Sequence, residues 1–135
     1  MDEAQQYHIQ NTYTGSRMFY NGDRQELGCY NKRYYDDQLW KLKREMDSDY
    51  YEIFREIKGR KMYLAYDGKK LFMSNNVGSN QLWKFIPARG EFYRILNKTS
   101  GAKLYHSERG GGEFGAFVGD DYDDQIWHII PIKCV

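Results

Sequence analysis

The sequence predicts an all-β fold, and three observations point to it. Aromatic residues make up 17% of the 135 residues, with 13 tyrosines among them, and aromatic and β-branched side chains favour strands over helices. These residues come in short bursts separated by Gly, Asn and Asp, which are typical of turns. A unit of roughly 43 residues also recurs three times. A chain of this length builds one hydrophobic core, so we expect a single domain over residues 1–135.

The three copies span about residues 7–46, 50–88 and 92–132, and each has the same landmarks. A tyrosine opens each copy, and a glycine follows it by eight residues. A Gln-x-Trp triplet closes each copy, and its tryptophan follows the glycine by 25, 24 and 26 residues. The landmarks are Tyr7, Gly15 and Trp40, then Tyr51, Gly59 and Trp83, then Tyr93, Gly101 and Trp127. The small differences in spacing place the length changes in loops.

Each copy carries four short strand signals, which in the first copy fall at residues 7–10, 17–20, 27–31 and 39–42. The opening strand alternates apolar and polar residues, with Tyr7 and Ile9 on one face and His8 and Gln10 on the other. This alternation is typical of a half-buried strand. Gly15 lies at the turn into the second strand, where we expect a positive φ angle that suits a residue without Cβ.

The fourth strand of each copy surrounds its tryptophan with apolar residues, which are Leu39 and Leu42 in the first copy. One copy alone cannot bury this group. Three copies around a pseudo-three-fold axis can close a six-stranded barrel and cap it with three hairpins, which hides the strand edges. The sequence therefore predicts a β-trefoil of three four-stranded repeats. A three-bladed propeller is the geometric alternative, but propellers usually have at least about four blades.

Charge and cysteine content limit the classes of partner. The net charge is +1, from 20 basic and 19 acidic residues, so no overall field favours nucleic acid or anionic lipid. The sequence has neither a signal peptide at its start nor an apolar run of about 18 residues, so we expect a cytoplasmic protein without membrane insertion. Cys29 and Cys134 form no CxxC pair, and we expect both to be free thiols.

The residues do not indicate catalysis. His8 and His128 occupy positions that hold charged residues in the other copies, which favours a solvent-facing role over that of a base. Cys29 aligns with Phe72 and Ala116, as a small buried residue would. The acidic run at residues 120–124 lacks the glycine turn and distal glutamate of a calcium loop, so it is interpreted as a solvated loop. We predict no enzyme, no metal site and no cofactor.

The closing triplets Gln38-Leu39-Trp40, Gln81-Leu82-Trp83 and Gln125-Ile126-Trp127 resemble the Gln-x-Trp signature of ricin B-type (R-type) lectin domains. The opening of the third copy, residues 93–104, is similar to the start of that family's repeat, and the resemblance covers residues 7–132. It implies a β-trefoil that binds carbohydrate. Within the triplets we assign both the tryptophan and the glutamine to structure, because a buried indole fills the core and a buried amide satisfies backbone groups.

The resemblance also indicates where sugar would bind. In these lectins an acid follows the second strand, an aromatic residue stands on the third, and an Asn precedes the Gln. The candidates are Asp23, Tyr30, Asn31 and Asp37 in copy one; Asp67, Phe72, Asn75 and Asn80 in copy two; and His106, Glu108, Phe117, Asp121 and Asp124 in copy three. Such aromatic and carboxylate groups suit a sugar ring and its hydroxyls. Copy one has the most complete set, followed by copy three and then copy two.

One feature of the family pattern is missing. The family places an aspartate directly after the apolar residue of the second strand, where this sequence has Asn21, Ala65 and His106. In a separate comparison of the ends of the second strands, His106 aligns with Tyr20 and Leu64, and it is the one histidine expected near a pocket. Recognition of galactose in the manner of ricin is therefore not implied by this position.

We predict a non-catalytic lectin with up to three shallow glycan sites, of galactose or N-acetylgalactosamine type, whose avidity comes from multivalency. Its partners would be glycans or glycoproteins, and a homodimer is left open. The alternative is a protein-interaction β-trefoil, such as a protease inhibitor or a cytoskeletal or signalling partner, that binds through its loops.

Overall fold

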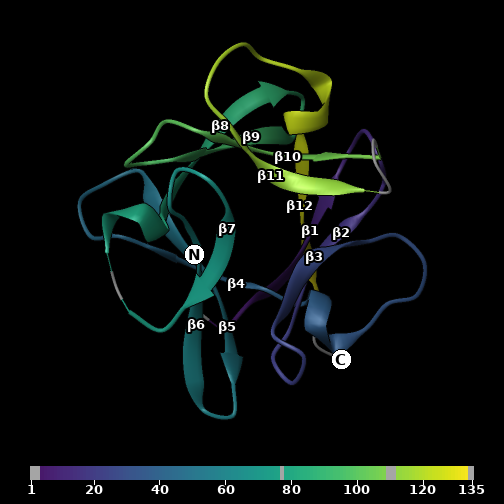
Figure 1. The fold of residues 1–135 in the computed structure, drawn as a ribbon, viewed down its shortest axis with the longest axis vertical. Coiled ribbons are helices and arrows are strands. Elements are labelled where there is room, and N and C mark those ends of the chain that lie inside the picture. Colours follow the sequence, from purple (N-terminus) through teal and green to yellow (C-terminus); the bar gives the residue numbers. More distant parts are fainter. Residues whose placement is uncertain (1–3, 77, 109–111, 134–135) are drawn as a thin grey trace.

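The computed structural model describes residues 4–76, 78–108 and 112–133, and it is built almost entirely of strands (Figure 1). The strands are β1 (Gln6–Asn11), β2 (Arg17–Asn21), β3 (Glu26–Tyr30), β4 (Lys41–Arg44), β5 (Tyr50–Ile57), β6 (Arg60–Tyr66), β7 (Leu71–Ser74), β8 (Leu82–Arg89), β9 (Phe92–Asn97), β10 (Lys103–Ser107), β11 (Glu113–Phe117) and β12 (Trp127–Ile132). Short 3-10 turns, η1 (Asp36–Gln38), η2 (Ser79–Gln81) and η4 (Asp123–Gln125), precede β4, β8 and β12. The predicted fourth strand of copy one begins at Lys41 rather than Leu39, because Leu39 caps η1 and Trp40 makes only an isolated bridge to Tyr7.

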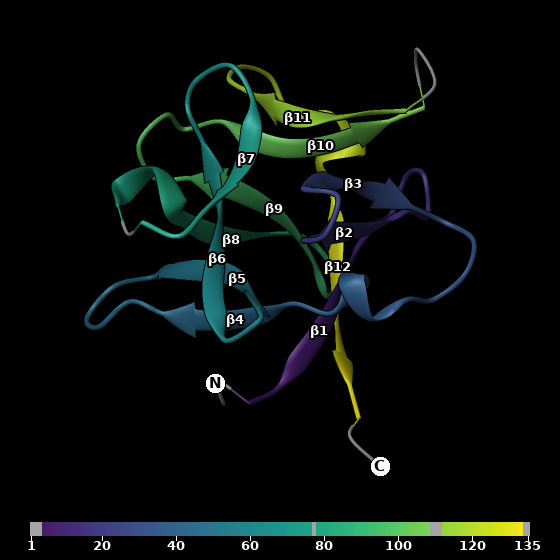
Figure 2. The same ribbon diagram turned by 60° about the horizontal axis from the view of Figure 1, so that its bottom comes forward.

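Six of the strands close a barrel. β1 pairs with β12, β12 with β9, β9 with β8, β8 with β5, and β5 with β4. A bridge between Tyr7 and Trp40 joins β4 back to β1. The remaining strands form the hairpins β2–β3, β6–β7 and β10–β11, which lie at the end of the molecule opposite the two termini (Figure 2). The predicted β-trefoil is confirmed, and the propeller alternative is excluded because strands from all three copies share one sheet.

The three tryptophans form the centre of the core. Trp40, Trp83 and Trp127 have no exposed surface. Each indole N–H donates a hydrogen bond to a second-strand carbonyl of its own copy, and these bonds measure 2.8, 2.9 and 3.0 Å. The carbonyls belong to Met18, Leu64 and Leu104, whose side chains are also fully buried. Burial of both the ring and its N–H explains why each copy needs a tryptophan at this place.

These three hydrogen bonds also define which residues are equivalent, and they correct two sequence alignments. Leu64 matches Met18 and Leu104, so His106 corresponds to Tyr20 and Tyr66, not to Leu64. By the same register Cys29 corresponds to Met73 and Ala116, not to Phe72. The residues that directly follow the apolar residue of the second strand are Phe19, Ala65 and Tyr105, so the assignment of Asn21 and His106 to that place was wrong.

The misplacement of Leu64 arises from two length changes that cancel in copy two. From the turn glycine to the tryptophan-bonding residue there are five steps in copy two (Gly59 to Leu64) but three in copies one and three. The β6–β7 turn is shorter to compensate, since Tyr66 pairs with Leu71 whereas Tyr20 pairs with Leu27. The overall spacing of the landmarks therefore hides a shift of two residues.

Two structural predictions are confirmed. Gly15, Gly59 and Gly101 have φ angles of 75°, 78° and 74°, which is the left-handed region that favours glycine. Each triplet glutamine is buried, and its side chain makes hydrogen bonds to nearby groups. The side-chain oxygens of Gln81 and Gln125 accept the backbone N–H groups of Gly78 and Tyr122 at 3.0 and 3.1 Å. Gln38 differs, because its oxygen accepts the Arg17 side-chain Nε–H at 2.8 Å.

Other expectations concern cysteine, metals and membranes. Cys29 is a free, half-buried thiol whose pKa is raised well above its ordinary value by burial, and Cys134 lies outside the described residues. Within residues 4–76, 78–108 and 112–133, no group of three or more His, Cys, Asp or Glu is arranged to hold a metal ion. The same part of the chain contains no helix that is both long and apolar enough to cross a membrane.

Candidate functional site

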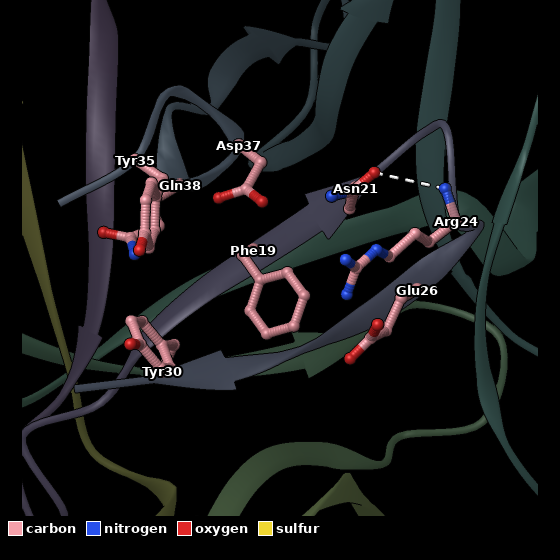
Figure 3. A pocket seen from close by; sticks show the side chains of 8 residues that line it. All are labelled: Phe19, Asn21, Arg24, Glu26, Tyr30, Tyr35, Asp37 and Gln38. Carbon is pink, nitrogen blue, oxygen red and sulfur yellow. Dashed lines mark hydrogen bonds between the residues drawn. The ribbon is translucent and has the colours of Figure 1, made fainter. Parts of the chain in front are cut away.

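Copy one contains a cavity of about 370 Å³ between the β2–β3 hairpin and the η1 turn; we call it site one (Figure 3). It is lined by Phe19, Asn21, Arg24, Glu26, Tyr30, Tyr35, Asp37 and Gln38. The strands supply the floor, because Phe19 on β2 pairs with Gly28 on β3 and the missing Cβ of the glycine leaves room for the ring to lie against β3. The η1 turn supplies the carboxylate of Asp37. Site one therefore joins an apolar ring to polar groups from a second element.

The polar groups of site one converge over the Phe19 ring. In Figure 3 the side chains of Asp37, Arg24 and Glu26 point toward that ring, while Tyr30 and Tyr35 stand at the opposite end of the cavity. Tyr30 and Tyr35 contact each other at a centroid distance of 5.9 Å. Burial raises the pKa of Asp37, and the nearby positive charge of Arg55 opposes this shift. An apolar ring face with carboxylates beside it can hold a polyhydroxylated ring, whose C–H face stacks while its hydroxyls donate hydrogen bonds.

Copy three contains the equivalent cavity, of about 410 Å³, which we call site three. Its lining is Tyr105, Ser107, Glu113, Ala116, Phe117, Tyr122, Asp124 and Gln125. Seven of these eight residues stand at positions that also line site one, as the strand register and the triplets show. The matched pairs are Phe19 and Tyr105, Asn21 and Ser107, Glu26 and Glu113, Tyr30 and Phe117, Tyr35 and Tyr122, Asp37 and Asp124, and Gln38 and Gln125. The same pocket is thus built twice.

The two sites differ in how their glutamate is held. The Tyr105 hydroxyl donates a hydrogen bond of 2.5 Å to Glu113 in site three. Burial and this bond to Glu113 raise the pKa of Tyr105 to about 12. Site one has Phe19 at the matching position, so it has no hydroxyl to fix Glu26 in the same way. The acceptor oxygens of Glu113 are therefore oriented by the protein itself.

Copy two lacks the groups that define the other two sites. Ala65, Ser74, Gly78 and Asn80 stand where site one has Phe19, Tyr30, Tyr35 and Asp37. None of these four residues is aromatic or acidic. Asp67, at the Asn21 position, accepts the backbone N–H groups of the next turn at 2.8 and 2.9 Å, and these bonds lower its pKa. Copy two therefore keeps the frame of the pocket without its aromatic walls and carboxylates.

The opening strand of the following copy braces each 3-10 turn. Asn11 donates a side-chain hydrogen bond to the carbonyl of Asp124 at 2.8 Å, and Asn97 donates one to the carbonyl of Asn80 at 2.9 Å. Arg55 stands at the matching place for site one and donates to the carbonyls of Asp36 and Leu39 at 3.0 and 2.9 Å. A third Arg55 bond, of 2.7 Å, reaches the carbonyl of Tyr20. The position of Asp37 in site one therefore depends on a residue of copy two.

The sequence candidates of copies one and two are placed as follows. Tyr30 and Asp37 line site one. Asp23 does not line it, because it lies in the β2–β3 turn with its carboxylate 3.7 Å from Lys58 Nζ, and Asn31 is exposed beyond the end of β3. In copy two, Asn80 stands at the Asp37 position, whereas Asp67 caps a turn and Asn75 is exposed after β7. Phe72 lies on β7 at the place of Gly28.

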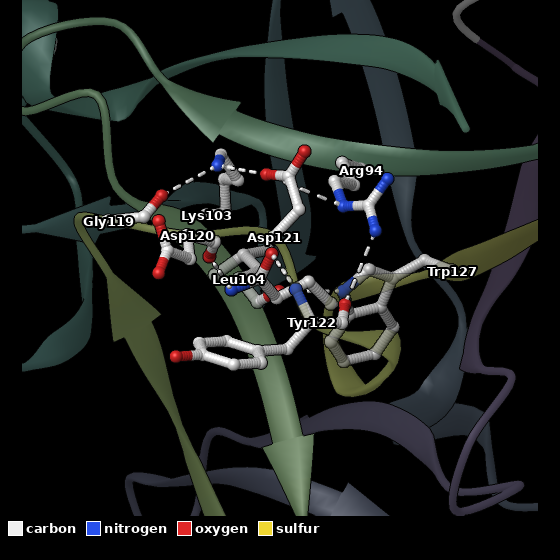
Figure 4. Close-up of polar contacts among 9 residues, drawn as sticks. Arg94, Lys103, Leu104, Gly119, Asp120, Asp121, Tyr122 and Trp127 are labelled. Carbon is white, nitrogen blue, oxygen red and sulfur yellow. Dashed lines mark hydrogen bonds and ion pairs between the residues drawn. The ribbon is translucent and has the colours of Figure 1, made fainter.

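In copy three, Phe117 and Asp124 line site three. Glu108 lines a neighbouring hollow. His106 is buried, its pKa is lowered by burial, and its Nδ1 is hydrogen-bonded to the Thr14 hydroxyl at 2.7 Å. Asp121 points away from the Tyr122 ring and pairs with Lys103 and Arg94 (Figure 4). His106 and Asp121 thus make internal contacts instead of lining the cavity.

Sequence reasoning missed several lining residues, and one signal could have found two of them. Tyr35 and Tyr122 each stand three residues before the triplet glutamine. The run Tyr-Asp-Asp-Gln is identical in copies one and three, whereas copy two has Gly-Ser-Asn-Gln. Phe19, Tyr105, Glu26 and Glu113 gave no such signal, because their equivalence depends on the strand register.

A β-trefoil that carries two copies of a shallow pocket with aromatic walls and carboxylates belongs to the class of carbohydrate-binding proteins by its fold and site chemistry. No family model matches the chain. The chain is 38% identical over 106 residues to a GM1b/asialo-GM1 oligosaccharide-binding R-type lectin of Mytilisepta virgata, which covers 77% of this chain and 78% of the relative. The chain therefore belongs to the R-type lectin family.

Solved structures agree with this assignment. The structure of SeviL bound to asialo-GM1 saccharide is similar with a TM-score of 0.82 at 31% identity, over 93% of this chain and 96% of that one. The BEL β-trefoil in its apo form is similar in fold with a TM-score of 0.84 at 22% identity, over 98% and 96% of the two chains. Since its relatives are lectins, the protein is a non-catalytic carbohydrate-binding protein, as the sequence predicted. This finding favours the lectin over the protein-interaction alternative.

Proposed function

We propose that sites one and three bind glycan and that copy two does not bind it in the same way. The observation that carries this proposal is the recurrence of one pocket at seven matched positions in copies one and three. Four of the five aromatic and acidic positions of this set are replaced in copy two, where Ala65, Ser74, Gly78 and Asn80 stand. A site for sugar needs both kinds of group, because stacking alone does not orient the hydroxyls.

In each site the role of a side chain follows from its place in the lining of the cavity. The ring of Phe19 or Tyr105 offers its face to the C–H side of a sugar ring, and Tyr35 or Tyr122 forms a second wall. Asp37 or Asp124 accepts hydrogen bonds from adjacent hydroxyls, and Glu26 or Glu113 accepts on the opposite side. Such charge-assisted hydrogen bonds are the stronger kind, so these carboxylates contribute most of the orientation.

The ligand class we propose is a glycan of galactose or N-acetylgalactosamine type. The asialo-GM1 oligosaccharide, which is named for both the relative and the solved lectin, is the first probe to test. Two sites on one chain allow multivalent attachment to a glycan-covered surface, so a modest affinity per site gives a higher avidity. A homodimer, which remains a prediction, would double the number of sites.

The test is a titration of the asialo-GM1 oligosaccharide by isothermal calorimetry. We expect two sites per chain in the wild type, one in Asp37→Ala, one in Asp124→Ala, and none in the double variant. The matched control is Asn80→Ala, which changes the equivalent residue of copy two and should leave two sites. Each variant should melt within a few degrees of the wild type. Unchanged binding by the double variant would contradict the proposal.

A further inference from the structure

A second hollow adjoins site three. This adjoining hollow has a volume of about 460 Å³ and is lined by Tyr13, Ser107, Glu108, Tyr122, Asp123 and Asp124. Three of these residues, Ser107, Tyr122 and Asp124, also line site three. Each hollow alone falls within the roughly 300 to 1,000 Å³ of pockets that hold small ligands. Because the two hollows share these three lining residues, the second lies within reach of a ligand longer than site three.

One lining residue of the adjoining hollow, Tyr13, comes from copy one. Tyr13 lies in the loop between β1 and β2, and 66% of its surface is exposed. An exposed aromatic ring beside an acidic rim is the same combination that defines sites one and three. The adjoining hollow therefore offers a second stacking surface for a sugar unit, which comes from a different repeat than site three itself.

Hydrogen bonds hold the Tyr13 loop against site three. The side-chain oxygen of Asn11 accepts the backbone N–H groups of Tyr13 and Thr14, each at 3.0 Å. The amide of the same Asn11 donates to the carbonyl of Asp124 at 2.8 Å. The Thr14 hydroxyl is bonded to His106 Nδ1 at 2.7 Å. The loop is thus anchored at both the η4 turn and β10, so Tyr13 is positioned before any ligand arrives, which lowers the entropic cost of binding.

The other two copies do not repeat this arrangement. The residue that matches Tyr13 is Ile57 for site one and Thr99 for copy two, six residues after the opening tyrosine in each case. Ile57 packs against Gly22 in the β2–β3 turn, where its Cγ2 lies 2.6 Å from the place of a Cβ on that glycine. The Thr99 hydroxyl donates to Ser79 at 2.8 Å. Of the three matched positions, only the one beside site three presents an aromatic ring.

The charge of the combined groove limits the class of glycan. Carboxylates of Glu108, Glu113, Asp123 and Asp124 line the two hollows, and no Lys, Arg or His among residues 4–76, 78–108 and 112–133 lines either hollow. Site one differs, because Arg24 is part of its lining. An anionic sugar in the groove of copy three would meet like charges, which disfavour binding. A neutral glycan meets hydrogen-bond acceptors for its hydroxyls instead.

We infer that site three and the adjoining hollow together form an extended site for a neutral oligosaccharide, in which site three holds one sugar unit and Tyr13 stacks against the next. Site one is the shorter of the two sites and tolerates negative charge better. This inference rests on the proposed function, since it assumes that site three binds glycan. His106 and Asn11 act in it as positioning residues, which place Tyr13 without contacting the ligand.

The test uses the Asp37→Ala background, in which site three is the remaining proposed site. Binding of methyl galactoside and of the asialo-GM1 oligosaccharide is measured by NMR titration with and without Tyr13→Ala. We expect Tyr13→Ala to weaken oligosaccharide binding about three- to tenfold and to leave the monosaccharide affinity unchanged. Tyr13→Phe keeps the ring and should restore the oligosaccharide affinity. An equal loss for both ligands, or no loss for either, would overturn the extended site.

A second arm tests the charge. In the same background the asialo-GM1 oligosaccharide is compared with its sialylated counterpart, and we expect the sialylated form to bind at least about fivefold more weakly. Glu108→Gln should reduce this difference in affinity between the neutral and the sialylated oligosaccharide. Equal or tighter binding of the sialylated form would refute the preference for neutral glycans. Loss of all binding on Asp124→Ala with no effect of Tyr13→Ala refutes only the extended site, whereas unchanged binding on Asp124→Ala refutes the proposed function itself.

Discussion

Copy two and its two neighbours share a core but differ at the surface. Trp83 is buried and bonded as Trp40 and Trp127 are, and the isoleucines of the opening strands, Ile9, Ile53 and Ile95, are equally inaccessible. At the pocket, however, copy two has Asn80 where the others have aspartates. The core must fit three copies around one axis, so its residues cannot change independently. Sites one and three are lined by different residues, so each can lose or gain a binding function without disturbing the fold.

The shared core can be tested through the copy that lacks the pocket residues. Trp83→Ala removes a fully buried ring and its hydrogen bond to the Leu64 carbonyl. The cavity and lost burial should lower the free energy of unfolding by about 3 to 5 kcal/mol, which chemical denaturation measures. Glycan binding by the remaining folded protein should persist, because copy two is not a proposed site. A loss below about 1 kcal/mol would contradict the central role of the three tryptophans.

Arg55 of copy two braces site one, and removing its side chain should have the next largest effect on stability. Arg55→Ala removes three hydrogen bonds from a guanidinium group to the carbonyls of Tyr20, Asp36 and Leu39. Because one side chain makes all three, their contributions do not add, and we expect a loss of about 2 to 3 kcal/mol in unfolding free energy. Site one should lose affinity while site three keeps its own.

The control for this prediction is Arg60→Ala, which removes an exposed arginine from the neighbouring strand β6. It should change the unfolding free energy by less than about 0.5 kcal/mol. If Arg55→Ala weakened glycan binding at site three as much as at site one, the proposal that Arg55 supports site one alone would be wrong.

The sequence predicted the fold far better than the site, and particular residues show why. The Gln-x-Trp triplets are defined by the closure of the core, so they stay in register in all three copies and reveal the trefoil. Tyr30, Asp37, Phe117 and Asp124 were found because they stand close to those triplets or on the third strand. Phe19 and Tyr105 were missed because they lie on the second strand, whose alignment across the copies was shifted.

The remaining site candidates depended on where a side chain points. Asp23 lies near Asn21 in sequence, but the turn between them directs its carboxylate toward Lys58. His106 was expected near a pocket, yet it faces Thr14 of another copy. Contacts between repeats are not visible in the spacing of residues within a repeat. The sequence therefore indicates which turns carry a site, and the structure is needed to identify the side chains that line it.

The turn glycines offer a smaller test that should affect all copies alike. Gly59→Ala places a Cβ at a φ of 78°, where nothing else lies within 4 Å of the new atom. The cost then comes from backbone strain alone and should be about 1 to 2 kcal/mol. Gly15→Ala and Gly101→Ala should cost the same within error, since their φ angles are 75° and 74°. Thermal denaturation of the three variants compares them directly, and a large difference between them would show that the turns are not equivalent.

The smallest expected effect is a pH dependence of site one. Burial raises the pKa of Asp37, and Arg55 offsets part of that shift. As the pH falls, Asp37 therefore takes up a proton earlier than an ordinary aspartate would and loses its charge-assisted hydrogen bonds to the ligand. In the Asp124→Ala background, affinity for the asialo-GM1 oligosaccharide should fall roughly two- to fivefold between about pH 7 and pH 5.

Unfolding driven by Asp37 cannot cause this loss, because a carboxyl group with a higher pKa in the folded than in the unfolded state favours folding as it is protonated. Asp37→Asn in the same background should bind more weakly at pH 7 but with a flat pH profile, and an equally steep profile in that variant would assign the titration to another group.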